Sequence, residues 1–211
     1  MSEYTFPFHT CEEKTDDGIF AQPYSAIANI ITCFIIIYFL LKTENTYSFL
    51  LLLSILAFEA FHAFSHMVHI PGTMQINITH ALAYCTNIAF LNMFYNVTHV
   101  FPDYLFLIYL CIVVMFDLYA FFNFAFVYYF SSSSLLFVSI LFYYYSLLPE
   151  SLQTNIYLII AIVVIVIGMF FNESYNCDKM LSMYPGIPYH IIIEITGMYL
   201  FYVICSNFYN L

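Results

Sequence analysis

The stretch FEAFHAFSHMVHIPGTMQINITHALAY, residues 58–84, decides how the rest of the sequence is interpreted. Its first part ends a long apolar run. At ~100° per residue, its polar side chains fall within about a third of the helix circumference. These side chains are Glu59, His62, Ser65, His66 and His69. Such a stripe is costly in hydrocarbon unless it faces a cavity, a partner or an ion. It therefore indicates a functional centre on one face of an apolar helix.

The composition around this stretch is that of a membrane protein. The chain has 211 residues, of which 64% are hydrophobic and 8% charged, and its mean hydropathy is +0.88. A soluble domain carries about a quarter charged residues. The net charge of −10 excludes nucleic acid as a partner, because nucleic acid requires a basic surface. The N-terminus lacks a basic region followed by an apolar core, so we expect no cleaved signal peptide.

The apolar runs predict an all-α integral membrane protein, a seven-transmembrane helix bundle around a polar cavity. The bundle occupies residues 24–211, after an exposed acidic N-terminal segment at 1–23. Each run is close to the ~20 residues that a bilayer requires, except 135–148, so six spans are the alternative. The predicted spans are residues 24–41, 47–70, 75–97, 104–126, 135–148, 155–171 and 189–207.

The topology places the two ends of the chain on opposite sides of the membrane. Lys42 is the only basic residue in a short loop beside the first span, and basic loops favour the cytoplasm. We therefore expect an extracellular or lumenal N-terminus and a cytosolic C-terminus. Cys11 and Cys177 then share the outer side, where a disulfide between them is expected if that side is a lumen.

The same topology brings three histidines to one membrane depth. His69 ends the second span, His80 begins the third and His190 begins the seventh, all on the outer side. Three imidazoles and a water form the usual catalytic zinc site, in which the water ionises near neutral pH. His66 could replace one of the three ligands. The alternative is that these histidines lie at the interface and bond to backbone or lipid headgroups.

Two acidic residues accompany these histidines. Glu194 lies one turn after His190 and shares its face, as a ligand, a partner that orients His190, or a general base. A neutral glutamic acid between helices is the alternative. Glu59 and His62 lie about 10–15 Å below His69 by helical rise, too deep to share an ion with it. We interpret them as structural, with a second site or a proton path as alternatives.

Three segments resemble the alkaline ceramidases and their superfamily of seven-span membrane hydrolases, which includes adiponectin-receptor-like and GPI-lipid-remodelling proteins. SHMVH at 65–69 is similar to the Ser-x-x-x-His of the family's second span. YHIIIEITGMYL at 189–200 resembles the seventh-span signature around its second histidine. CEE at 11–13 with AQPYSAIAN at 21–29 resembles the segment that carries calcium ligands. The middle spans match only in hydrophobicity.

The sequence departs from the family pattern at several positions. Gly186 stands where the family has the first histidine of the seventh span, and His80 stands near the place of its aspartate. One interpretation is a ligand swap that keeps three histidines, and the other is a decayed or repurposed site. Gln22 replaces an acid of the calcium segment, which leaves Glu12 and Glu13 as candidate Ca²⁺ ligands.

The resemblance implies zinc-dependent hydrolysis of the amide bond of a ceramide-like membrane lipid. His69, His80 and His190 would hold Zn²⁺, Ser65 would stabilise the oxyanion or position the water, and Glu194 would transfer protons. The alternatives are a non-enzymatic receptor-like or structural protein, and a metal or proton transporter that uses the stripe on the second span. The sequence leaves the lipid headgroup, the organelle and the oligomeric state open.

Overall fold

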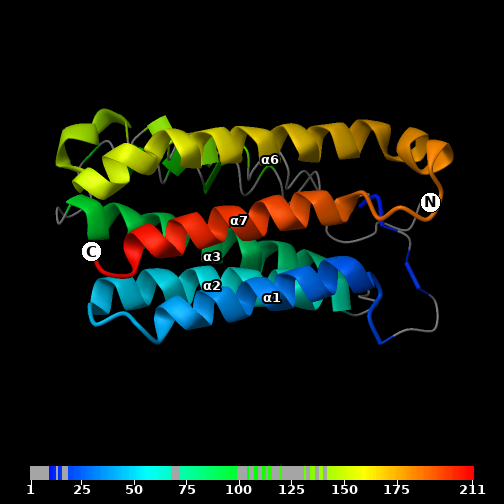
Figure 1. Cartoon of the computed structure of the whole chain (residues 1–211), viewed down its shortest axis with the longest axis horizontal. Helices are drawn as coiled ribbons and strands as arrows, with labels where there is room; N and C mark the ends of the chain where they lie inside the picture. The colour runs from blue at the N-terminus through cyan, green and yellow to red at the C-terminus, as the bar shows by residue number, and fades with distance from the viewer. Residues whose placement is uncertain are drawn as a thin grey trace.

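The computed structural model describes residues 10–12, 14–15, 19–67, 72–98 and 142–211, with single positions between 104 and 139. Within these residues the chain is all-helical and contains no strand. The long helices lie side by side, most of them along one axis (Figure 1). They are α1 (Pro23–Leu40), α2 (Thr46–Met67), α3 (Gly72–Thr98), α6 (Glu150–Met183) and α7 (His190–Phe208), with a short 3-10 turn, η1 (Tyr145–Leu147).

Four of these helices, α1, α2, α6 and α7, are long and apolar enough to cross a membrane, which indicates a multi-pass membrane protein. α3 is not among the four, because polar residues such as Asn77, His80 and Asn87 lower its hydropathy. The predicted spans at 104–126 and 135–148 lie largely outside the described residues. A total of seven membrane spans therefore stays a prediction.

α6 is longer than the sequence predicted. The sixth span was expected to end at residue 171 and to be followed by a polar loop, but the helix continues to Met183. Its 34 residues correspond to about 51 Å at ~1.5 Å per residue, well beyond the ~30 Å hydrocarbon thickness. After Gly168, which lies within the helix, no glycine or proline occurs until Pro185 and Gly186, and Gly186 has a positive φ of 84°. The polar residues therefore end the apolar run without ending the helix.

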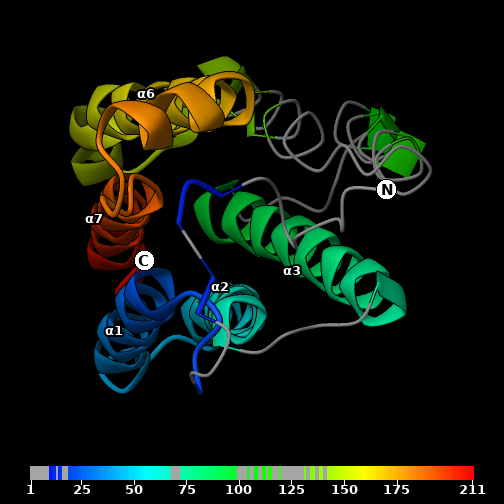
Figure 2. The same ribbon diagram turned by 90° about the vertical axis from the view of Figure 1, so that its right-hand side faces the viewer.

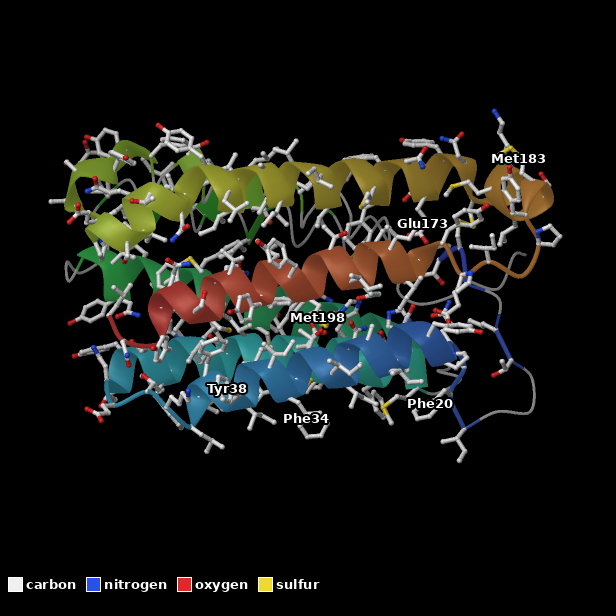
Figure 3. The ribbon with its side chains drawn as sticks, viewed as in Figure 1. Phe20, Phe34, Tyr38, Glu173, Met183 and Met198 are labelled. Atoms are coloured by element: carbon white, nitrogen blue, oxygen red, sulfur yellow. A yellow bond between two sulfur atoms is a disulfide. The ribbon has the colours of Figure 1, made fainter. Side chains whose placement is uncertain are left out.

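The helices pack in a consistent order around a shared apolar core. α1 contacts α2 and α7, α2 contacts α3, and α6 contacts α7. Leu51, Leu82, Leu152 and Phe208 are among the buried residues that join these helices. The outer face of α1 is also apolar: side chains such as Phe34 point away from the bundle (Figure 3) and are exposed. This outer face is suited to contact with lipid.

The N-terminal segment crosses the end of the bundle where α1 begins and α2 ends (Figure 2). A disulfide joins Cys11 to Cys177 on α6, as the topology predicted. The segment was expected to be exposed. Lys14 and Thr15 are exposed, whereas Thr10, Cys11 and Glu12 are buried. These buried residues differ from the expectation because they contact the helix ends beneath them.

Glu12 caps the first turn of α1 from outside the helix. One carboxylate oxygen accepts a hydrogen bond from the Tyr24 N–H at 2.8 Å, and the other accepts from the Ser25 N–H at 3.1 Å and from the Ser25 hydroxyl. The first N–H groups of a helix have no partner within the helix, and its N-terminus favours negative charge. A buried carboxylate and a buried helix start therefore satisfy each other.

We expect Glu12→Ala to lower the thermal midpoint of the purified protein, because it leaves buried N–H groups without an acceptor. Loss of a capping interaction costs about 1–2 kcal/mol. The midpoint is measured in detergent by intrinsic tyrosine fluorescence. Glu44→Gln, at an exposed acidic residue in the α1–α2 loop, is the control and should leave it unchanged. Equal midpoints for Glu12→Ala and wild type would contradict the capping role.

Candidate metal centre

Two helix ends meet near the N-terminal segment and carry four residues able to bind metal. His62 and His66 are four residues apart near the end of α2, and His190 and Glu194 are four residues apart at the start of α7. This spacing places both members of each pair on one helix face. The ring centroids of His66 and His190 are 5.4 Å apart, so the two faces look toward each other.

The inner nitrogens of His62, His66 and His190, which are their Nε2 atoms, lie around one carboxylate oxygen. Oε1 of Glu194 lies 3.6 Å from Nε2 of His62, 3.5 Å from Nε2 of His66 and 2.7 Å from Nε2 of His190. The Nε2 atoms of His62 and His66 are 3.3 Å apart. Tetrahedral ligands at 2.0–2.1 Å from a zinc ion are about 3.3 Å from one another. His62, His66 and Glu194 thus have the spacing of a metal-binding group.

The outer nitrogens of His66 and His190, which are their Nδ1 atoms, lie close to oxygen atoms of neighbouring side chains. Nδ1 of His66 lies 2.7 Å from Oε1 of Gln22, and Nδ1 of His190 lies 2.9 Å from both carboxylate oxygens of Glu173. An acceptor at Nδ1 favours the tautomer with the hydrogen there, which leaves the lone pair on Nε2. Metal-binding histidines are oriented by the same kind of outer partner.

Glu59 and Asn29 complete the surroundings of the group. Nδ1 of His62 lies 3.6 Å from Oε2 of Glu59, an electrostatic contact too long for a hydrogen bond. With its amide nitrogen facing the two carboxylates, Asn29 donates to Oε1 of Glu59 at 2.9 Å and to Oε2 of Glu194 at 2.7 Å. One amide group therefore satisfies one oxygen of each buried glutamate.

Two buried polar atoms at the centre of the group lack a hydrogen bond within the described part of the chain. Nε2 of His190 and Oε1 of Glu194 are buried and, among the residues that the structure describes, have no aligned hydrogen bond although they are close together. Burying lone pairs without a partner is costly, and more so at low local dielectric. A cation between these atoms, either a metal ion or a shared proton, would remove that cost.

The structure brings together three of the predicted site residues. His66, His190 and Glu194 all lie at the centre, and His66 is a member of the metal-binding group rather than a substitute for another ligand. The predicted set of His69, His80 and His190 stays a prediction, because His69 is not among the described residues. His62 also takes part, one turn before His66.

The remaining predicted residues lie elsewhere. His80 is on α3, half-buried, with its ring stacked 6.0 Å from that of Tyr84, and it is not part of the group. His69 lies outside the described residues. The Ser65 hydroxyl donates to the carbonyl oxygen of His62 at 2.6 Å, within its own helix, and does not reach the centre.

Sequence reasoning missed His62, Asn29, Gln22 and Glu173. His62 was judged too deep because His69 was taken as the anchor of the site. The spacing of four residues between His62 and His66, repeated between His190 and Glu194, was the signal that could have identified it. Asn29 and Gln22 lie in the quoted N-terminal motif, but nothing in the sequence pairs them with particular partners.

The calcium prediction near Glu12 and Glu13 receives no support from the described residues. The Glu12 carboxylate faces the N-terminus of α1, and Glu13 lies outside the described residues. Within the part of the chain that is described, the only cluster of three or more metal-binding side chains is the one formed by His62, His66 and Glu194.

The fold and the site together define a helical membrane protein with a candidate metal centre at one end of its bundle. Comparison with protein-family models, with curated proteins and with solved structures finds no match. The resemblance to the alkaline ceramidases therefore rests on the quoted motifs alone and stays a prediction.

We expect Asn29→Leu to destabilise the protein, because it removes the donor shared by Glu59 and Glu194 and leaves two buried carboxylate oxygens unpaired. The loss is about 2 kcal/mol or more and is measured as a lower thermal midpoint in detergent. Asn176→Leu, at an exposed position on α6, is the matched control. An unchanged midpoint for Asn29→Leu would show that the amide does not bridge the carboxylates.

Proposed function

We propose that the protein binds zinc through His62, His66, His190 and Glu194 and uses it to hydrolyse the amide bond of a membrane lipid. The observation that carries this proposal is the meeting of three Nε2 atoms on one carboxylate oxygen, at distances of 2.7–3.6 Å. The outer partners of the histidines support it, because they leave the Nε2 lone pairs directed inward.

Zinc suits the donor set better than other common ions do. Imidazole nitrogens together with one carboxylate oxygen are typical zinc ligands, whereas magnesium and calcium require mainly oxygen. When bound, the ion would activate water and polarise the carbonyl of the substrate.

The protein residues divide the remaining work. His62, His66 and His190 would hold the ion, and the partners of their Nδ1 atoms orient the rings. Glu194 would supply a fourth ligand, and its other oxygen accepts a hydrogen bond from Asn29. When substrate and water enter, its Oε1 is placed to accept a proton and deliver it to the leaving amine. Ser65 has no role here, because its hydroxyl is bonded to the helix backbone.

An apolar cavity beside the centre supports a lipid substrate. The cavity has a volume of about 110 Å³ and lies between α2, α3, α6 and α7, lined by residues such as Phe58, Ala89 and Phe201. The ring of Phe58 lies 5.9 Å from that of His62, so one wall of the cavity adjoins the metal group. A hydrocarbon chain in the cavity would bring the carbonyl at its head toward Glu194.

The Cys11–Cys177 disulfide supports an oxidising compartment for the end of the bundle that holds the site. We therefore place the N-terminus and the metal centre on the extracellular or lumenal side and the C-terminus in the cytosol. The amide bond as the target is what the ceramidase-like motifs support.

A structural metal site is the second candidate function. Four protein ligands around one ion are typical of closed structural sites, whereas catalytic sites keep a position for water. Glu194 decides between the two, because it is either a permanent fourth ligand or an exchangeable one. Replacing Glu194 by Gln separates them: a structural site loses zinc or stability, whereas a catalytic site keeps zinc and loses activity.

We expect purified wild-type protein to contain close to one zinc per chain by elemental analysis, with iron and manganese measured in the same samples. His62→Ala, His66→Ala and His190→Ala should each lose most of it, because each variant removes one of the three imidazole ligands. His80→Ala is the control and should retain it. Loss in His80→Ala with retention in His62→Ala would favour the set that the sequence predicted and contradict this one.

We expect the protein to release fatty acid from a long-chain lipid amide in mixed micelles, and the release to stop on chelation and return with zinc. Ala89→Phe, which fills the cavity, should lower the rate for long chains by about ten-fold or more and spare short chains. Ala60→Phe, at an exposed position on α2, is the control.

Unchanged chain-length preference in Ala89→Phe would remove the cavity from the proposal. Zinc binding without any amide hydrolysis in the wild type would leave the structural metal site as the better reading.

A further inference from the structure

Glu173 is not a member of the metal-binding group, yet it contacts His190 at the centre. It is buried on the side of α6 that faces α7 (Figure 3). Both of its carboxylate oxygens are 2.9 Å from Nδ1 of His190. Glu173 is thus the acceptor that keeps the Nε2 lone pair of His190 directed at the centre.

A second hydrogen bond fixes the Glu173 carboxylate from the opposite side. The backbone N–H of Cys11 donates to Oε1 of Glu173 at 2.7 Å. Cys177 lies four residues after Glu173 on α6 and therefore on the same face. The Cys11–Cys177 disulfide, with its Cα atoms 5.4 Å apart, holds the Cys11 backbone over Glu173.

We propose that Glu173 is a positioning residue for His190 and that the Cys11–Cys177 disulfide keeps it in place, so that reduction of this disulfide weakens metal binding. The inference rests on the metal centre proposed above. It states that the redox state of the Cys11–Cys177 disulfide controls metal binding, although the disulfide contacts none of the proposed metal ligands directly.

Reduction has a defined chemical course. A trialkylphosphine breaks the S–S bond, takes oxygen from water to become the phosphine oxide, and leaves two thiols that carry the two protons of that water. Cys177 is only partly buried at the end of the bundle, so a small reductant reaches a sulfur atom.

Part of the N-terminal segment stays attached after reduction. Glu12 still binds the first turn of α1, and Gln22, at the start of that helix, still contacts His66. The Cys11 backbone is then no longer tied to α6. Its N–H, which donates to Glu173, is therefore no longer held in place. We therefore expect weaker zinc binding rather than loss of the fold.

Zinc affinity is measured by competition with a chromophoric chelator, with the full-length protein in detergent, before and after phosphine treatment. Loss of an outer partner lowers metal affinity about 10–100-fold. We expect about ten-fold on reduction and the same for Cys177→Ser, which should no longer respond to phosphine. Cys111→Ser, at an exposed cysteine, is the control and should behave as the wild type does.

Variants of Glu173 separate positioning from packing. Glu173→Leu should lower zinc affinity by about 10–100-fold. Glu173→Gln should recover much of this loss, because its amide oxygen still accepts from Nδ1 of His190. Equal losses in both variants, with lower thermal midpoints, would indicate packing alone and overturn the positioning role.

A readout that does not need metal separates this inference from the proposed function. In zinc-free protein, diethyl pyrocarbonate labelling of His190, followed by mass spectrometry, should rise on reduction and in Glu173→Leu. Zinc binding that ignores reduction would overturn the inference and leave the metal centre standing. If the oxidised wild type binds no zinc, the proposed centre fails, and unchanged labelling of His190 would then also reject the Glu173 contact.

Discussion

The buried carboxylate of Glu194 is the constraint on which the rest of the structure depends. It lies among apolar helices, where burying an unpaired charge would cost on the order of several kcal/mol. Its two oxygens are met from different directions, one by the Asn29 amide and the other by three imidazoles. α1, α2 and α7 must therefore keep their relative positions along the bundle axis. A shift of one helix by one turn would leave the Glu194 carboxylate among apolar side chains.

The outer partners extend this constraint to the ends of the bundle. Gln22 precedes α1, Glu59 belongs to α2 and Glu173 belongs to α6, and each contacts the outer nitrogen of one histidine. The N-terminal segment joins two of these partners, because Gln22 donates to the Glu12 carbonyl and the Cys11 N–H donates to Glu173. The segment is thus part of the site, although the site contains none of its side chains as a ligand.

The parts of the fold that depend on local composition could be predicted from the sequence. α1, α2 and α7 follow apolar runs closely, and the Cys11–Cys177 pair followed from counting sides of the membrane. The length of α6 could not be predicted, because a helix outside the bilayer needs no apolar run. His66 and His190 were found from their positions near span ends. His62 was missed because its depth in the membrane was compared with the depth of His69 and not with that of Glu194.

The described centre includes His62 and His66 on α2, which precede His69, the residue that the resemblance implies, and so lie deeper along the predicted span. Gly186, where the resemblance implies a histidine, belongs to the turn before α7 begins at His190, where its positive φ suits a chain reversal. In the proposed metal centre, Glu194 would take the place of this histidine one turn after His190, and His62 would extend the set on α2. Under that proposal the departure at Gly186 would be a displacement of the site rather than its loss. The deeper position brings the metal group against Phe58 and the apolar cavity, where the carbonyl of a lipid chain would have to be.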